Sequence, residues 1–279
     1  MLVNLNALLP QAAAKSYAVA GFNVFGFEDA RAVIQAAEKL STGVILMANR
    51  DSLAQIPVEH FGPMLARLAE AVRVPVCVHL DHTDKEADII RAIKAGFSSV
   101  MFDGSQLPLE ENIDRTRRVV EMAHAVDVTV EGEVGSVGYN EPNKMIETVL
   151  TDPKDAGAFA HRTGADAVAV AVGTQHRMTT QGARIDYDRV AAIAAKVDQP
   201  LVIHGTSGVT DTDLRRLATT RVAKFNIGTA LRMAFGHSLR ETIAERPEVF
   251  DRLELFRVPW TRLQAAAEEK LDLLGGTEE

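Results

Sequence analysis

The sequence predicts a single-domain α/β protein with the (β/α)8 TIM-barrel fold, spanning residues 1–279. Two observations predict this fold. Short apolar runs alternate with amphipathic helical patterns eight times, and no linker rich in Gly, Ser or Pro divides the chain. The apolar runs are almost continuous, as expected of parallel strands that are buried on both faces.

The expected strands are apolar runs such as "GVILMAN" and "AVAVAVG", each ending in turn-forming or polar residues. In chain order they cover 18–26, 43–49, 75–82, 99–105, 128–135, 167–173, 200–205 and 222–229. Each is followed by a helical pattern, at 27–40, 58–72, 84–96, 108–126, 152–164, 186–197, 210–220 and 230–243. A ninth pattern, 260–275, predicts an extra C-terminal helix.

The composition limits the function. A chain of 279 residues that is 47% hydrophobic can bury a large core, and a net charge of −8 without a basic stripe argues against nucleic-acid binding. No apolar run is long enough to cross a membrane, and residues 1–22 lack the pattern of a signal peptide, so we expect a cytoplasmic protein. The single cysteine, Cys77, lies in an apolar run and is expected to be a reduced core residue.

Side chains capable of chemistry stand at the ends of the expected strands, where barrel enzymes place their active sites. The strand ends carry Asp81-His82, Asp103-Gly104-Ser105, Glu131 and Glu133, Gly173 to Arg177, His204 to Gly208, and Asn226 to Thr229. Three of the eight histidines, His82, His176 and His204, therefore fall at three strand ends.

Three imidazoles at one barrel mouth favour a divalent ion of the zinc type with an open position for substrate. Any one of these histidines alone would more simply be a hydrogen-bonded structural residue, and only the coincidence of all three at one barrel mouth favours a metal site. His79 differs from them. Regular strand alternation places it on the side of Asp81 and opposite His82, behind the site or in the core.

Glycine-rich segments end the last two expected strands, in "HGTSG" and "NIGT". Their backbone amides, together with the helix N-termini that follow, can face an anion. Such glycine stretches are common in loops, but their location after strands 7 and 8, a frequent phosphate site in barrels, favours an anion site here.

Motifs along nearly the whole chain resemble one family. "HLDH", "MFDGSQLPLEENI", "VEGEVGSVG", "AVAVGTQH", "VIHGTSG" and "KFNIGT" resemble the class II, metal-dependent ketose-bisphosphate aldolases, closest to their fructose- and tagatose-bisphosphate branch. That family reversibly cleaves a ketose phosphate into dihydroxyacetone phosphate and an aldehyde. The resemblance therefore implies a carbon–carbon lyase acting on a phosphorylated ketose.

The resemblance also implies roles for single residues. Zn²⁺ would be held by His82, His176 and His204, with Glu133 beside it. Asp81 would protonate the aldehyde oxygen, or act as its conjugate base in cleavage, and Glu141, on a loop that can move, would take the proton from the donor carbon. The alternative for Asp81 is a helix N-cap, although Thr83 or Asp84 is better placed to cap.

The family's substrate contacts map onto seven further positions. The donor phosphate and hydroxyl would be held by Gly205, Ser207, Asn226, Gly228 and Thr229, and Asn23 and Ser105 would also contact the substrate. The resemblance further implies a monovalent cation, Na⁺ or K⁺, near the phosphate. We also expect a homodimer or homotetramer, with no nucleic-acid or membrane partner.

Departures from the family fall around the substrate. Arg177 stands where glycine is usual after the strand-6 histidine, and a nearby phosphate-binding lysine is missing. Arg177 could replace that charge, close the site or bind another donor. Arg50, in "ANRDSL", could meet an anionic distal group or be an exposed charge. Gln106 replaces a common histidine, and a C-terminal "DPR" pattern is reduced to Asp251-Arg252.

Two functions remain open from the sequence. The first is an active zinc aldolase. The second is a catalytically silent or altered metal-binding sugar-phosphate barrel with a sensing or scaffolding role. The intact set of three histidines, Asp81 and Glu141 favours the first. If the metal were absent, a Schiff-base route would need Lys224, near the end of the last strand.

Overall fold

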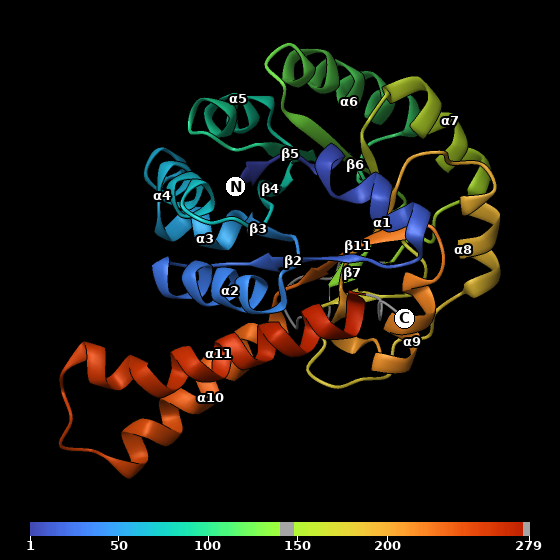
Figure 1. Ribbon diagram of the computed structural model, residues 1–279. Coiled ribbons are helices and arrows are strands. Elements are labelled where there is room, and N and C mark those ends of the chain that lie inside the picture. Colours follow the sequence, from blue (N-terminus) through green and yellow to red (C-terminus); the bar gives the residue numbers. More distant parts are fainter. Residues whose placement is uncertain (140–147, 276–279) are drawn as a thin grey trace.

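Eight parallel strands close into a barrel in the computed structural model, which describes residues 1–139 and 148–275 (Figure 1). The barrel strands are β2 (Val19–Asn23), β3 (Val44–Ala48), β4 (Val76–Thr83), β5 (Ser99–Phe102), β6 (Thr129–Val134), β8 (Ala167–Val170), β10 (Leu201–Ile203) and β11 (Val222–Ile227). Each strand pairs with the next, and β11 pairs with β2 to close the ring. The predicted (β/α)8 barrel is confirmed.

Helices surround the barrel at the predicted places (Figure 1). They are α2 (Phe27–Leu40), α4 (Val58–Glu70), α5 (Glu86–Lys94), α6 (Leu109–His124), α7 (Pro153–Thr163), α8 (Tyr187–Ala194), α9 (Asp211–Ala218) and α10 (Thr229–Glu245). The main core lies between strands and helices, where outward-facing residues such as Phe22, Val78 and Phe225 are buried. The helices that alternate with the strands thus cover the outer face of the barrel sheet all the way around.

The barrel interior has two layers. A short N-terminal segment closes its floor: β1 (Leu2–Val3) pairs with β4, and η1 (Leu5–Ala7) and α1 (Leu9–Lys15) follow. Their apolar side chains pack with interior residues such as Met47 and Cys77, whose thiol is free and buried. Above this apolar layer the interior is polar, with His79, Glu131 and Lys224 fully buried. The polar layer lies directly beneath the strand ends.

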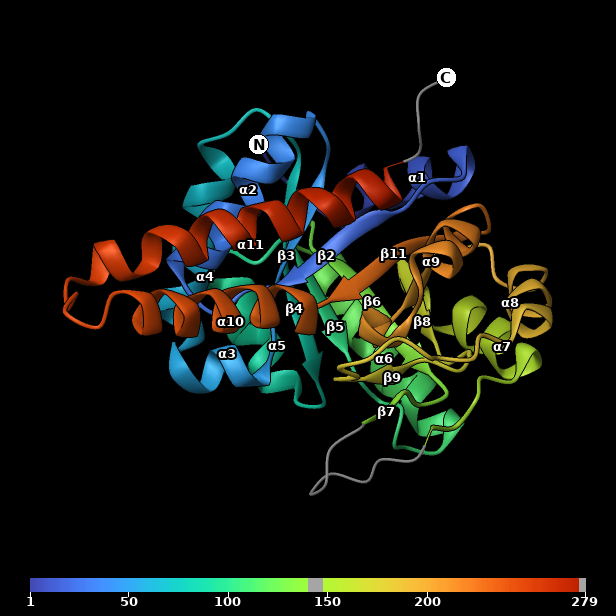
Figure 2. The ribbon, with the colours of Figure 1, turned by 90° about the horizontal axis from the view of Figure 1, so that it is seen from below.

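The C-terminal helix is longer than predicted. α11 (Arg252–Leu274) begins at Arg252 and not at residue 260, because Asp251 caps it by accepting from the amides of Leu253 and Glu254. Pro259 is accommodated inside the helix. Figure 2 shows α10 and α11 side by side, projecting from the barrel as an arm.

A short helix and a two-stranded sheet at the carboxyl end of the barrel were not predicted. α3 (Arg50–Gln55) follows β3, and the side chain of Asn49 caps it by accepting from the amide of Ser52. β7 (Gly138–Tyr139) pairs in parallel with β9 (Gln175–His176) outside the barrel. Both elements carry or support residues at the barrel mouth. Among the helices in the described ranges, none combines the length and apolarity that a membrane span requires.

Candidate active site

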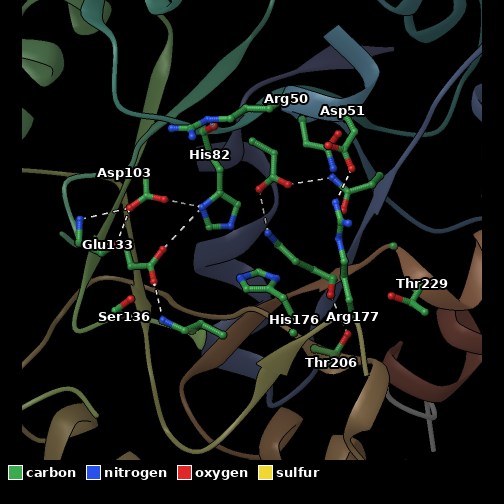
Figure 3. A pocket seen from close by; sticks show the side chains of 18 of the residues that line it. Arg50, Asp51, His82, Asp103, Glu133, Ser136, His176, Arg177, Thr206 and Thr229 are labelled. Carbon is green, nitrogen blue, oxygen red and sulfur yellow. Dashed lines mark hydrogen bonds and ion pairs between the residues drawn. The ribbon is translucent and has the colours of Figure 1, made fainter. Parts of the chain in front are cut away.

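One cavity at the carboxyl ends of the strands brings together the residues that the sequence singled out. Its lining includes Asn23, Arg50, Asp81, His82, Ser105, Glu133, His176, Arg177, Gly205, Ser207, Asn226, Gly228 and Thr229. His204 lies fully buried directly behind His82. Glu141 lies outside the described residues. Figure 3 shows the imidazoles of His82 and His176 next to one another in this cavity.

The three histidines form a compact group. One nitrogen from each of His82, His176 and His204 lies within 4.8 Å of the others. The ring centroids of His82 and His204 are 4.6 Å apart, and those of His82 and His176 are 5.2 Å apart. A second group with the same spacing joins His82 to Asp103 and Glu133. Either group has the ligand types that hold a divalent ion.

The backbone at His82 brings this ring to the cavity. His82 has a φ of 51°, in the left-handed region, and the pairing of β4 with β5 shifts register after Leu80. The expected regular alternation to the end of the strand is therefore wrong, and both Asp81 and His82 line the cavity. His79, before the irregularity, lies buried below them, with its Nδ1 2.8 Å from Ser99 Oγ.

Carboxylates fix two of the rings so that their other nitrogens are available. Nδ1 of His82 lies 2.8 Å from Asp103 Oδ2, and Nε2 of His204 lies 2.8 Å from Glu131 Oε1. The opposite nitrogens, His82 Nε2 and His204 Nδ1, are buried and make no hydrogen bond within the described part of the chain, as is also true of Glu133 Oε2. Buried polar atoms without partners are costly, so these atoms fit a metal ligand set.

The charges around the group favour a cation. Burial opposes a charge on His82, but Asp81 and the hydrogen-bonded Asp103 outweigh it and raise the pKa of His82 to about 10. Burial and the charge of Asp103 raise the pKa of Glu133 to about 8. Burial lowers the pKa of His176 and of His204, which keeps both rings in the neutral form that binds metals. A divalent ion would supply the positive charge that these carboxylates attract.

Two asparagines hold Asp81. Nδ2 of Asn23 donates to Asp81 Oδ2 at 2.8 Å, and Nδ2 of Asn226 donates to Asp81 Oδ1 at 3.0 Å. Burial opposes ionisation of Asp81, yet the neighbouring His82 and His204 hold its pKa below the usual range. Asn23 and Asn226 were expected to contact the substrate. In the structure their amides orient the carboxylate of Asp81.

The helix-cap alternative for Asp81 is excluded. α5 begins at Glu86, and Lys85, at the N-cap position, makes no side-chain cap. The expectation that Thr83 or Asp84 caps this helix is also wrong. Thr83 Oγ1 accepts from the amide of Lys85, at 3.3 Å, and not from the first turn of α5, because the connection after β4 is longer than the sequence pattern indicated.

Buried charges beneath the site form a network that was not predicted from the sequence. Nζ of Lys224 lies 2.7 Å from Glu131 Oε2 and 2.7 Å from Asn226 Oδ1. All three side chains are buried. The only signal in the sequence was the presence of charged residues inside two expected strands. Because Lys224 is paired with Glu131, its amine is not available as the sequence alternative of a Schiff-base lysine requires.

The opposite side of the cavity is suited to an anion. η2 (Thr206–Gly208) follows Gly205, whose φ of 68° and close approach to Gln175 leave no room for a side chain. α10 begins after Gly228, and its N-terminal amides lie at the same cavity. Ser207 Oγ is buried without a hydrogen bond in the described ranges. Arg232, one turn into α10, also lines the cavity and was missed from the sequence.

Arginines and acids alternate along the rim. Arg177 pairs with Asp51 of α3, and Arg50 pairs with Asp84 at 2.8 Å while its Nε donates to the carbonyl of His82 at 3.3 Å. Figure 3 shows Arg177 and Asp51 together on the side of the cavity away from Asp103. The side chain of Arg50 is 63% exposed and also lines the cavity. Both expectations therefore stand: a contact with the far end of the substrate, or a surface charge.

Comparisons with known proteins agree over the whole chain. The family model of class II fructose-bisphosphate aldolase matches residues 3–279. The structure of the YdjI aldolase from Escherichia coli K12 has 32% identity and a TM-score of 0.87, covering 99% of this chain and 98% of that one.

Two further structures are similar. A putative fructose-1,6-biphosphate aldolase from Coccidioides immitis has 27% identity and a TM-score of 0.85, covering 98% of this chain and 96% of that one. The fructose-bisphosphate aldolase of Campylobacter jejuni, at 23% identity and a TM-score of 0.80, covers 98% of this chain and 95% of that one and shows the shared fold.

Proposed function

The chain belongs to the class II fructose-bisphosphate aldolase family, and on that premise we propose that it is a Zn²⁺-dependent aldolase. It reversibly cleaves a phosphorylated ketose into dihydroxyacetone phosphate and an aldehyde. One observation carries the proposal: His82 Nε2 and His204 Nδ1, which are buried and make no hydrogen bond to any residue in the described ranges, converge with His176 beside an oriented carboxylate, Asp81, in one cavity. Metal ligands and a proton carrier in contact are what this cleavage needs.

A divalent ion held by His82, His176 and His204 would supply positive charge for the substrate oxygens as negative charge develops on them. Glu133 lies close to this group: its Oε2 is 3.8 Å from His204 Nδ1, a nitrogen that could bind the ion, and 3.8 Å from His82 Nδ1, the nitrogen that Asp103 contacts. Its carboxylate adds a fourth potential ligand or accepts a proton when the ion is absent.

Two carboxylates divide the proton transfers. In the cleavage direction Asp81 accepts the proton of the hydroxyl that becomes the aldehyde oxygen, while Asn23 and Asn226 hold its carboxylate in place. The carbon–carbon bond breaks, and its electron pair stays on the three-carbon fragment. Glu141 then delivers a proton to that carbon and gives dihydroxyacetone phosphate. In synthesis each step runs in reverse.

The donor phosphate binds on the glycine-rich side. Amides around Gly205, Ser207, Gly228 and Thr229 face it, and a monovalent cation, Na⁺ or K⁺, can share its charge. Arg232 adds a full positive charge from the first turn of α10. Ser105, on the other side, is oriented by Asp103, which accepts from its hydroxyl at 2.7 Å.

The proposal is tested with the purified protein, metal analysis and a panel of ketose 1-phosphates and 1,6-bisphosphates. Release of aldehyde and dihydroxyacetone phosphate that depends on bound Zn²⁺ supports it. Asp81→Asn, which keeps the shape and loses the proton carrier, is the matched control and should bind metal without turnover. A metal-bound wild type that cleaves no member of the panel favours the sensing or scaffolding alternative.

We also propose that the protein assembles into a homodimer or homotetramer. Large apolar side chains are exposed on the α10–α11 arm, with Phe250 92% and Leu253 80% exposed. Burial of such side chains against a second copy would be favourable. Light scattering on the eluting protein measures the mass, and a monomer at micromolar concentration contradicts the proposal.

A further inference from the structure

Lys224 joins the two halves of the candidate site. It lies on β11 with its ammonium buried between Glu131 of β6 and Asn226 of its own strand. We infer that Lys224 is a positioning residue, which sets the metal ligand His204 through Glu131 and the proton carrier Asp81 through Asn226. This role rests on the proposed function for Asp81, but its metal half can be measured without any activity.

The first arm reaches the metal ligand. Nζ of Lys224 holds Oε2 of Glu131 at 2.7 Å, and Oε1 of the same carboxylate lies 2.8 Å from His204 Nε2. With Nε2 occupied, the ring turns Nδ1 towards the other ligands. A carboxylate that contacts the distal nitrogen of a ligand histidine fixes the ring and its tautomer. Lys224 therefore acts on a potential metal ligand that it does not touch.

Loss of the ammonium would disturb this arm specifically. Glu131 is fully buried, and a buried carboxylate that loses its cation is strongly destabilised. Its other close neighbour is His79, whose Nε2 lies 3.7 Å from Oε2. Without Lys224, the Glu131 carboxylate would turn towards His79, and its contact with His204 Nε2 would weaken.

The second arm reaches Asp81. An ammonium offers only donors, so the contact at 2.7 Å requires Asn226 to present its Oδ1 to Lys224. The amide nitrogen of Asn226 must then point the other way, where it donates to Asp81 Oδ1 at 3.0 Å. The contact with Lys224 thus fixes the orientation of the Asn226 side-chain amide, so that its nitrogen and not its oxygen contacts Asp81. Asn23 holds the second oxygen, so Asp81 is fixed at both.

The backbone around Lys224 leaves space for its stem. Gly21 of β2 lies beside it, and a Cβ at Gly21 would come within 3.4 Å of Lys224 Cε and 2.8 Å of Met47 Sδ. The aliphatic part of Lys224 therefore passes β2 at Gly21, where no side chain obstructs it. Its ammonium then reaches both Glu131 and Asn226.

The metal arm is tested by a double-mutant cycle. Dissociation constants for Zn²⁺ and Co²⁺ are measured by chelator competition for wild type, Lys224→Met, Glu131→Gln and the double variant. We expect each single change to weaken binding about ten- to a hundred-fold and to alter the visible Co²⁺ spectrum. The double variant should bind about as well as the weaker single variant, because the two residues act in series. Additive losses, or a Lys224→Met variant with wild-type affinity and spectrum, overturn the inference.

The Asp81 arm is tested on metal-saturated protein. Lys224→Met should slow ketose cleavage at least tenfold, while exchange of the donor's α-proton with solvent falls much less, since Asp81 serves only the aldehyde end. Equal losses in both reactions overturn this arm. If the wild type proves to have no aldolase activity, the proposed function fails, and the metal cycle still decides the inference.

Two further variants control for folding. Cys77→Ala alters another buried interior side chain outside the site and should leave metal affinity unchanged. Lys224→Gln keeps a neutral donor and serves if Lys224→Met does not fold. It should retain part of the metal affinity, and no loss at all in Lys224→Gln counts against a role for the charge.

Discussion

The guanidinium of Arg177 pairs with the carboxylate of Asp51, so the residue after a candidate metal ligand is tied to the helix that follows β3. Arg177 has a φ of 59°, a conformation that glycine adopts with less strain. Arg177 therefore occupies a position whose left-handed backbone conformation favours glycine. We expect it to have a function that offsets this strain.

Arg177 is expected to bind the donor phosphate from the rim. A charge-assisted contact to phosphate contributes about 1.5–3 kcal/mol, so Arg177→Ala should weaken binding of dihydroxyacetone phosphate roughly ten- to a hundred-fold. Zinc content should not change. Arg177→Lys should recover part of the loss, since lysine lacks the planar fork. Calorimetric titration measures the affinity.

Asp51→Asn supplies the opposite change. It removes the carboxylate that competes for Arg177, so donor affinity should stay the same or rise. If Arg177→Ala binds the donor as tightly as wild type, the arginine serves the aldehyde end or the rim itself. Arg50→Ala is expected to weaken the ketose while sparing the three-carbon donor, and the two variants therefore separate the two ends of the substrate.

The metal site should fail when any one histidine is removed. His82→Ala, His176→Ala and His204→Ala should each lose zinc and activity together, because a site with three protein ligands tolerates no missing ligand. Chelator should inactivate the wild type, and Zn²⁺ or Co²⁺ should restore it. His60→Ala, on the exposed face of α4, is the control and should keep both.

Full activity in excess chelator, with metal shown to be absent, contradicts the metal site. Borohydride trapping on substrate would then be required to label a lysine, and the buried pair of Lys224 with Glu131 predicts that Lys224 is not labelled.

The two proton carriers should separate by reaction. Asp81→Ala should slow cleavage by roughly 10²–10⁴, the range of general acid–base catalysis, and leave solvent exchange of the donor's α-proton measurable. Glu141→Ala should suppress that exchange most. Proton exchange is followed by NMR in D₂O with dihydroxyacetone phosphate alone. A Glu141→Ala variant that exchanges at the wild-type rate would show that another group deprotonates the carbon.

Asp29 should make the fold less stable as pH rises. Burial raises its pKa from 3.8 to about 6, although the amide of Phe25, 2.7 Å from Oδ2, opposes the shift. The folded state then holds this proton more tightly than the unfolded state. The group's penalty is absent below about pH 4, grows between pH 4 and 6, and is complete above pH 6.

Asp29→Asn tests that sign. Relative to wild type, the variant should gain about 1–2 kcal/mol in free energy of unfolding between pH 4 and pH 7, a value reduced because Asp29 is only partly buried. Urea unfolding at the two pH values, in the same metal state, measures it. A difference between the two proteins that does not change with pH removes Asp29 as the cause.

Local sequence patterns were enough to predict the barrel. Each strand is a short apolar run and each helix has its own period, so the alternation could be read without tertiary information, and the helix at 27–40 matches α2 at both ends. The start of α11 was missed because a proline usually interrupts a helix, and Pro259 lies inside this one. Packing of Phe256 on Phe235, with ring centroids 5.4 Å apart, stabilises the segment before that proline.

The interior of the site could not be read in the same way. Strand ends indicated where His82, His176 and His204 would meet, because parallel strands share one edge. The contacts of Lys224 with Glu131 and of Asn226 with Asp81 join residues 93 and 145 positions apart. No local period records such contacts, and the left-handed backbone at His82 is equally invisible in the sequence.

The division between strand ends and rim has a practical consequence for protein engineering. His82 and His204 are held at the ends of barrel strands by the carboxylates of Asp103 and Glu131, whereas Arg50 and Asp51 stand on α3 and Arg177 follows β9. A combinatorial library at these three rim positions would therefore leave the interior intact. Directed evolution for new sugar acceptors could begin at Arg50 and Asp51, whereas changes at Arg177 are expected to alter binding of the donor as well.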